Sequence, residues 1–336
     1  MVNCKRQQSP PAFFGGAPLF VFKYRPAFAL LLACFLFGWS PGPSRQSVNA
    51  QESKSKVQWN FLRAFRGETS ATGLLRQAVA LDLDSEGSVY VVDRALNRLL
   101  KFSSDGELIR EVGGFGREAD QFDDPRDVDA HNTLNVFVAD FNNNRVVRLD
   151  RNLNFISDVR GDQIADLPFE QVLSVSISTQ YDIFLLENVN KQIIKLNRQL
   201  APVAVFGGIQ ETFGQLLEPV QINLQENQRL FVSDAGQSAV LVFDYLGNYL
   251  ESVQLPGLSA PAGLYWGQDQ HLYVVDSADD ELWILDKTLR PLYHLMVPPP
   301  AHSLLDVAVR FDKTTGKRTL YLLSPGACWV AEVKNF

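Results

Sequence analysis

Short apolar runs recur along the chain at nearly constant intervals. Each run has five residues, mostly β-branched, aliphatic or aromatic, and the six runs end at Asp93, Asp140, Glu187, Asp234, Asp276 and Ser324. The intervals between these end residues are 47, 47, 47, 42 and 48 residues. Turn residues bound each run, and the apolar positions lack the spacing of three and four that an amphipathic helix needs. The pattern therefore predicts repeated β-strands.

Around each run the same order of elements returns. In the second repeat the pattern predicts strands over 126–130, 135–140, 145–150 and 155–160. Four antiparallel strands in a repeat of this length are typical of a β-propeller blade. The sequence thus predicts an all-β fold, a six-bladed β-propeller of four-stranded antiparallel blades.

The two ends of the repeat region indicate how the ring closes. The sixth repeat supplies only three strands, near 304–310, 319–324 and 328–334, while residues 59–67 precede the first repeat and match the fourth-strand pattern. An open ring would leave an unpaired sheet edge. We therefore expect the N-terminal strand to pair as the outer strand of the last blade.

The polar residues around the runs resemble the NHL repeat. The string Asp-x-x-x-Asn-Arg is complete at Asp93 to Arg98 and at Asp140 to Arg145, and prolines open several inner strands. The resemblance covers about residues 57–336 and weakens in the later repeats. We expect the Asp to accept backbone N–H groups in the following turn, the Asn to adopt the left-handed conformation, and the Arg to lie along the neighbouring blade.

The N-terminal fifty residues have the pattern of a targeting segment. An uncharged apolar run, 26–39, follows Lys23 and Arg25 and is too short for a comfortable bilayer span. This pattern predicts a signal sequence over 1–50 and a propeller over 51–336, with export to the periplasm or the extracellular space. A minority interpretation is a lipoprotein, because Leu31 to Cys34 is similar to a lipobox and a lipidated Cys34 would hold the chain to a membrane.

Cysteine and charge narrow the class of protein further. Of the three cysteines only Cys328 lies outside the targeting segment, so no disulfide is expected within the propeller, and its repeat position indicates packing. Without the five basic residues of the first fifty, 26 Lys and Arg face 38 Asp and Glu, a formal charge of −12. A body this acidic argues against nucleic acid as a partner, including the RNA binding that the resemblance to NHL propellers would allow.

The inner strands should bring one ring of polar positions to the mouth of the central channel. Two residues after each blade-opening position stand Ala80, Asp127, Ser174, Gln221, Gly263 and Asp306. We predict that Arg126, Asp127, Gln221 and Asp306 are the ligand-binding residues there. Two carboxylates could instead hold a calcium ion in the channel, or serve as an acid and a base, or remain as hydrated channel residues.

The positions of the histidines indicate whether the chain could hold a catalytic metal. Only His131, His271, His294 and His302 occur, and each occupies a different position in its blade. A zinc site needs three converging ligands, so we predict surface or packing roles for the histidines, no metal site and no catalytic residue. Motifs for a nucleophile elbow, a phosphate-binding loop or a zinc protease are also missing from the sequence.

Two functions remain. The first is a non-catalytic, monomeric, exported binding module that holds a protein, peptide or glycan on its loop rim and needs no cofactor. The second is a metal-dependent enzyme of the lactonase, esterase or lyase kind that uses the central channel, as the resemblance to other six-bladed propellers implies. The sparse carboxylates and scattered histidines favour the binding module.

Overall fold

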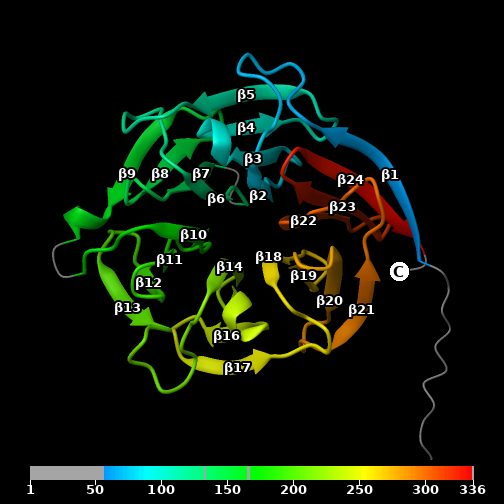
Figure 1. Ribbon diagram of the computed structural model, residues 1–336. Coiled ribbons are helices and arrows are strands. Elements are labelled where there is room, and N and C mark those ends of the chain that lie inside the picture. The colour runs from blue at the N-terminus through cyan, green and yellow to red at the C-terminus, as the bar shows by residue number, and fades with distance from the viewer. Residues whose placement is uncertain (1–56, 132–133, 165–166, 335–336) are drawn as a thin grey trace, which may run out of the picture. The chain divides into compact units, whose positions relative to one another are not determined.

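The computed structural model describes residues 57–131, 134–164 and 167–334. Within these residues, six four-stranded antiparallel sheets are arranged as the blades of a ring (Figure 1). The predicted six-bladed propeller is confirmed. Helical structure among the described residues is confined to three-residue 3-10 turns, and none of them could span a bilayer. They are η1 (Arg94–Leu96), η2 (Gly161–Gln163) and η3 (Ala235–Gln237).

The first three blades follow one another in chain order, each from its inner to its outer strand. They contain β2 (Ala78–Leu83), β3 (Val89–Asp93), β4 (Arg98–Phe102) and β5 (Leu108–Gly113); β6 (Pro125–Asp129), β7 (Asn135–Asp140), β8 (Arg145–Asp150) and β9 (Phe155–Arg160); and β10 (Val172–Ile177), β11 (Ile183–Glu187), β12 (Gln192–Leu196) and β13 (Pro202–Phe206).

The last three blades differ only in how the sixth is completed. They contain β14 (Pro219–Gln225), β15 (Arg229–Asp234), β16 (Ala239–Asp244) and β17 (Tyr249–Val253); β18 (Pro261–Trp266), β19 (Leu272–Asp276), β20 (Glu281–Leu285) and β21 (Pro291–Met296); and β22 (Asp306–Asp312), β23 (Lys317–Ser324), β24 (Ala327–Lys334) and β1 (Gln58–Phe65).

The apolar runs of the sequence are the second strands of the blades. Strands such as β3 and β19 are buried along their whole length, because both faces of a blade pack against neighbouring blades. One core cluster, for example, joins Val92 of β3 to Val138 of β7. The outer strand β21 is mostly exposed, and β5 has no buried residue. Burial on two faces explains why these runs are continuously apolar and do not alternate.

The N-terminal strand closes the ring as expected. Strand β1 lies beside β24 and pairs with it antiparallel (Figure 1). The register sets Trp59 opposite Val333 and Phe65 opposite Cys328. Phe65 is 2% exposed and its ring lies 5.6 Å from that of Phe102 in the first blade. The closing strand therefore joins the last blade by hydrogen bonds and the first blade by packing.

Cys328 is a buried free thiol in this core, and burial raises its pKa.

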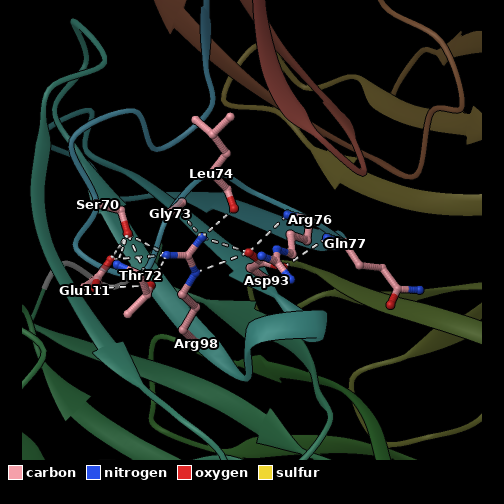
Figure 2. A network of polar contacts seen from close by, with 9 residues as sticks. All are labelled: Ser70, Thr72, Gly73, Leu74, Arg76, Gln77, Asp93, Arg98 and Glu111. Carbon is pink, nitrogen blue, oxygen red and sulfur yellow. Dashed lines mark hydrogen bonds and ion pairs between the residues drawn. The ribbon is translucent and has the colours of Figure 1, made fainter.

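The repeated Asp and Arg fix the loop that enters their own blade. The Arg98 guanidinium donates to the carbonyls of Gly73 and Leu74, at 2.8 and 3.0 Å, and pairs with Asp93 at 3.0 Å (Figure 2). Arg145 makes the equivalent contacts in the second blade. The expectation that this Arg lies along the neighbouring blade is wrong, because the carbonyls of its own entry loop offer better acceptors.

The Asn of the motif makes the contact between blades. Asn97 and Asn144 have φ angles of 49° and 52°, so both adopt the expected left-handed conformation. The Asn97 side chain accepts the backbone N–H of Asp124, at 2.8 Å, from the loop entering the next blade. The same residue thus sets the local turn and connects neighbouring blades.

The predicted signal sequence, with Cys4 and Cys34, lies outside the described residues.

Candidate functional site

A ring of side chains joins neighbouring blades at the start of the inner strands. At four of the six junctions a side chain at this position accepts a backbone N–H from the next blade. The pairs are Asp306 with Leu81 at 2.8 Å, Asp127 with Val175 at 3.0 Å, Ser174 with Ile222 at 3.0 Å, and Gln221 with Leu264 at 2.5 Å. The polar ring found in the sequence therefore fastens the blades around the axis.

The two aspartates of the ring follow the two members that lack a polar side chain. Ala80 and Gly263 offer no acceptor to the next blade, and there the Asp accepts the N–H of its own following residue, as Asp306 does from Val307 at 2.8 Å. A Cβ on Gly263 would lie 2.4 Å from the Cα of Asp306. Glycine is required because the Asp306 backbone and carboxylate occupy that space.

Three of the four predicted ligand-binding residues meet on the axis. Nε2 of Gln221 lies 3.2 Å from Asp306 and 3.5 Å from Asp127, so one amide bridges carboxylates of two other blades. Burial raises the pKa of Asp127 to about 7 and that of Asp306 well above its usual range. Asp127 and Gln221 line a cavity on each side of this bridge. The bridge is therefore a partition across the channel, and the three side chains bond mainly to one another and to backbone N–H groups.

The fourth predicted residue, Arg126, lies one ring outward, in the wall of the smaller cavity. Its guanidinium donates to Asp124 at 2.7 Å and stacks 4.4 Å above the ring of Phe141. The smaller cavity has a volume of about 320 Å³ and opens on the face where the inner strands start, which we call the entry face. All four predicted residues line it.

A larger cavity, of about 830 Å³, lies on the other side of the partition. Its walls come from the later residues of the inner strands and the turns after them, including Asp82, Asp129, Asn223 and Tyr265. A volume of this size accommodates a drug-sized ligand. The sequence interpretation put the ligand on the entry face and gave this opposite side no role.

Two carboxylates and an imidazole converge in the larger cavity. One ligand atom each from Asp82, Asp129 and His131 lies within 4.8 Å of the others. Asp82 and Asp129 point inward from adjacent inner strands, β2 and β6, and His131 follows β6 by two residues. Nδ1 of His131 lies 2.8 Å from Oδ1 of Asp129. We call these three residues the channel cluster.

Backbone hydrogen bonds hold the channel cluster in place. Asp82 accepts the N–H groups of Ala130 at 2.7 Å and Leu83 at 2.8 Å, while Oδ2 of Asp129 accepts that of Ile177 at 2.9 Å. Oδ1 of Asp129 is buried and accepts no well-aligned hydrogen bond within the described residues. One oxygen is thus left for a ligand other than backbone.

In the channel cluster, two carboxyl groups that repel each other when charged lie beside one imidazole. Burial, and then the neighbouring Asp129 carboxylate, raise the pKa of Asp82 to about 7. Desolvation lowers the pKa of His131, but the carboxylates of Asp129 and Asp82 outweigh it and raise that pKa to about 9. The cluster therefore stabilises positive charge, either a proton on the histidine or a bound cation.

Sequence reasoning missed the channel cluster, although the signal was present. Side chains two apart on a strand share a face, so Asp82 and Asp129 follow the polar ring by one strand period. What the sequence did not show is that His131 turns back onto Asp129, because that contact depends on the turn after β6. His131 was expected to have a surface or packing role.

Comparisons with known proteins place the fold only. No protein-family model and no curated protein matches the sequence. Among solved structures, the chain is similar to a streptogramin B lyase, with 12% identity, a TM-score of 0.58, and coverage of 83% of this chain and 98% of the other. It is also similar to virginiamycin B lyase from Staphylococcus aureus, both as a catalytically inactive histidine-to-alanine variant with quinupristin and in a selenomethionine form. These two show 12% identity, TM-scores of 0.56 and 0.55, and coverage of 82% and 84% of this chain and 99% of each other chain.

Proposed function

We propose that this chain is a metal-dependent propeller enzyme of the lactonase, esterase or lyase kind, with its reaction centre at the channel cluster. The observation that carries the proposal is the convergence of Asp82, Asp129 and His131 inside a cavity of about 830 Å³. This is the second of the two functions that the sequence left open. The likeness of the fold to streptogramin B lyase supports it.

The channel cluster fits a divalent cation by its donors. Oδ1 of Asp129 is buried, with Nδ1 of His131 2.8 Å away and no well-aligned hydrogen bond within the described residues, and a cation bound there would relieve the repulsion that raises the pKa of Asp82. Two carboxylates and one imidazole suit Zn²⁺ or Mn²⁺, whereas Ca²⁺ prefers oxygen ligands alone. A bound cation would polarise a carbonyl or acidify a water molecule.

The rest of the cavity wall supplies recognition. Asn223 is held by its hydrogen bond to the backbone N–H of Trp266, at 2.8 Å, and Tyr265 lies beside it along the channel. These side chains and the partition beyond them would form the inner end of the binding site. A substrate with a polarised ester or lactone carbonyl would enter from the opposite end and reach the channel cluster.

The test is turnover of lactones, aryl esters and quinupristin by the purified protein, with Zn²⁺ or Mn²⁺ and again with excess chelator. We expect turnover that is lost with chelator and reduced by about a hundredfold or more in Asp129→Asn. Asp105→Asn is the matched control, because Asp105 is an exposed carboxylate at the same cavity. Turnover that survives both chelator and Asp129→Asn would contradict the proposal.

A binding module remains the second candidate, because the loops of the entry face expose large apolar side chains. Phe115 is 74% exposed between β5 and β6, and Phe213 is 73% exposed between β13 and β14. A partner that lay across these loops would remove both rings from water, which is favourable. A peptide or glycan array should then lose its signal with Phe115→Ser and Phe213→Ser but not with Asp129→Asn.

Export is part of the same proposal. The apolar run 26–39 and the small residues before Gln51 support a cleaved signal sequence. Mass spectrometry of the N-terminus of the secreted or periplasmic protein should give Gln51. A mature chain that begins at Cys34 and carries a lipid would support the lipoprotein interpretation.

A further inference from the structure

The wall of the smaller cavity is one ring of equivalent positions. The residue before each member of the polar ring points into this cavity, and the six wall residues are Val79, Arg126, Leu173, Val220, Ala262 and Leu305. Five are aliphatic and one is cationic. A ring in which a single charge interrupts an apolar surface recognises a ligand that is itself apolar with one charged end.

Two guanidinium groups share one carboxylate near this cavity. Asp124 accepts from Nη2 of Arg126 at 2.7 Å and from Nη2 of Arg94 at 3.2 Å. One carboxylate therefore pairs with two guanidinium groups, and one positive charge is left over. The partly exposed Arg126 is the member of this trio that lines the cavity.

Arg126 also has one hydrogen-bond donor without a partner within the described residues. Its Nε is buried and has no hydrogen-bond partner within the described residues. The Cζ of this guanidinium lies 4.4 Å over the centre of the Phe141 ring, a favourable cation–π contact that helps to position it. A buried unpaired N–H costs free energy, which an incoming acceptor would recover.

The carboxyl groups at the floor of the cavity already have hydrogen-bond partners within the protein. Asp306 accepts the backbone N–H groups of Leu81 and Val307, and Asp127 accepts that of Val175. The amide of Gln221 covers both carboxylates. The floor is therefore satisfied by the protein, while the wall offers apolar surface and the Arg126 guanidinium, whose Nε has no hydrogen-bond partner within the described residues.

We propose that the smaller cavity binds a small aliphatic carboxylate, whose chain lies against the aliphatic wall and whose carboxylate pairs with Arg126. This site lies across the partition from the channel cluster and does not depend on the proposed enzymatic function. Charge-assisted hydrogen bonds to a guanidinium are strong, and bidentate pairing selects a carboxylate over other polar ends.

The experiment is isothermal titration of the purified protein with octanoate in the presence of chelator, compared with 1-octanol and octylammonium. We expect octanoate to bind more tightly than either by about tenfold or more. Arg126→Gln should remove this preference. Asp124→Asn should increase octanoate affinity, because it frees both guanidiniums, and asparagine tolerates the φ of 58° at that position.

The outcomes separate this proposal from the enzymatic one. Asp129→Asn should leave octanoate binding unchanged, since Asp129 does not line the smaller cavity. Equal affinity for octanol, tighter binding of octylammonium, unchanged binding in Arg126→Gln, or no octanoate binding in the millimolar range would each overturn it. Loss of turnover with intact octanoate binding would contradict the proposed function alone.

Discussion

The buried guanidinium of Arg145 holds the loop that enters its blade. Its side chain is 0% exposed, pairs with Asp140 at 2.7 Å and Asp158 at 3.1 Å, and donates to three carbonyls of the loop that enters its blade. A charge in this position is tolerated because every donor has an acceptor. At the scale of the residue, the repeated Asp and Arg therefore stabilise the loop that enters each of these blades.

Replacing this guanidinium should be costly. Arg145→Met keeps much of the volume but leaves the buried Asp140 carboxylate and the loop carbonyls unpaired, so we expect a loss of about 3–5 kcal/mol in the free energy of unfolding. Urea denaturation followed by tryptophan fluorescence measures it. Arg151→Ala, at an exposed ion pair with Glu86, is the control and should change stability by less than about 0.5 kcal/mol. Equal effects would show that the Arg145 network is not structural.

Asp306 gives stability a dependence on pH. Its pKa is raised well above 3.8 in the folded protein, chiefly by burial. From about pH 4 upward the unfolded chain releases this proton while the folded protein keeps it, so the contribution of Asp306 to stability falls as pH rises, until the folded pKa is passed. The difference in unfolding free energy between wild type and Asp306→Asn should therefore decrease between pH 5 and pH 7, measured by urea denaturation at each pH. A difference that grows with pH would contradict a raised pKa.

At the scale of the element, the closing strand determines whether the ring is continuous. Strand β1 alone pairs with the outer edge of β24, and its end residue Phe65 fills the space between the last and first blades. Gly106 has no side chain because a Cβ there would lie 2.5 Å from the Phe65 ring. The closure thus depends on one aromatic side chain and the glycine that receives it.

Phe65→Ala should therefore destabilise the whole ring. We expect a loss of about 3–5 kcal/mol, the usual cost of emptying a buried phenylalanine site. Leu62→Ala, on the same strand but 40% exposed, is the control and should cost much less. Hydrogen exchange should also show reduced protection along β24 in Phe65→Ala only. Full protection of β24 in that variant would mean that closure does not rely on this side chain.

The elements could be predicted because each blade repeats one local pattern. The predicted strands 135–140, 145–150 and 155–160 coincide with β7, β8 and β9, and the closing strand was expected from the missing fourth strand of the last blade. Side-chain contacts made through the loops could not be predicted in the same way. Arg98 and Arg145 turn toward their own entry loops, and His131 turns toward Asp129, through loop geometry that periodicity does not encode.

At the scale of the whole molecule, the ring gives two unlike cavities separated by one partition. The bridge of Asp127, Gln221 and Asp306 divides the channel, with an aliphatic wall and Arg126 on the entry face and the channel cluster on the other side. The residues expected to bind ligand line the smaller cavity, whereas the cluster that fits a cation lines the larger one. Two ligands of different chemistry could therefore occupy one propeller independently.

The most direct test is the metal content of the protein. Purified without chelator or an affinity metal, and dialysed against Zn²⁺, Mn²⁺ or Ca²⁺, the protein should retain about one equivalent of Zn²⁺ or Mn²⁺ per chain by elemental mass spectrometry. Asp129→Asn and His131→Ala should lose it while keeping the propeller's circular dichroism, and Asp105→Asn should keep it. Wild-type protein that retains no metal, or variants of the channel cluster that retain it fully, would contradict a metal-dependent reaction centre in the channel.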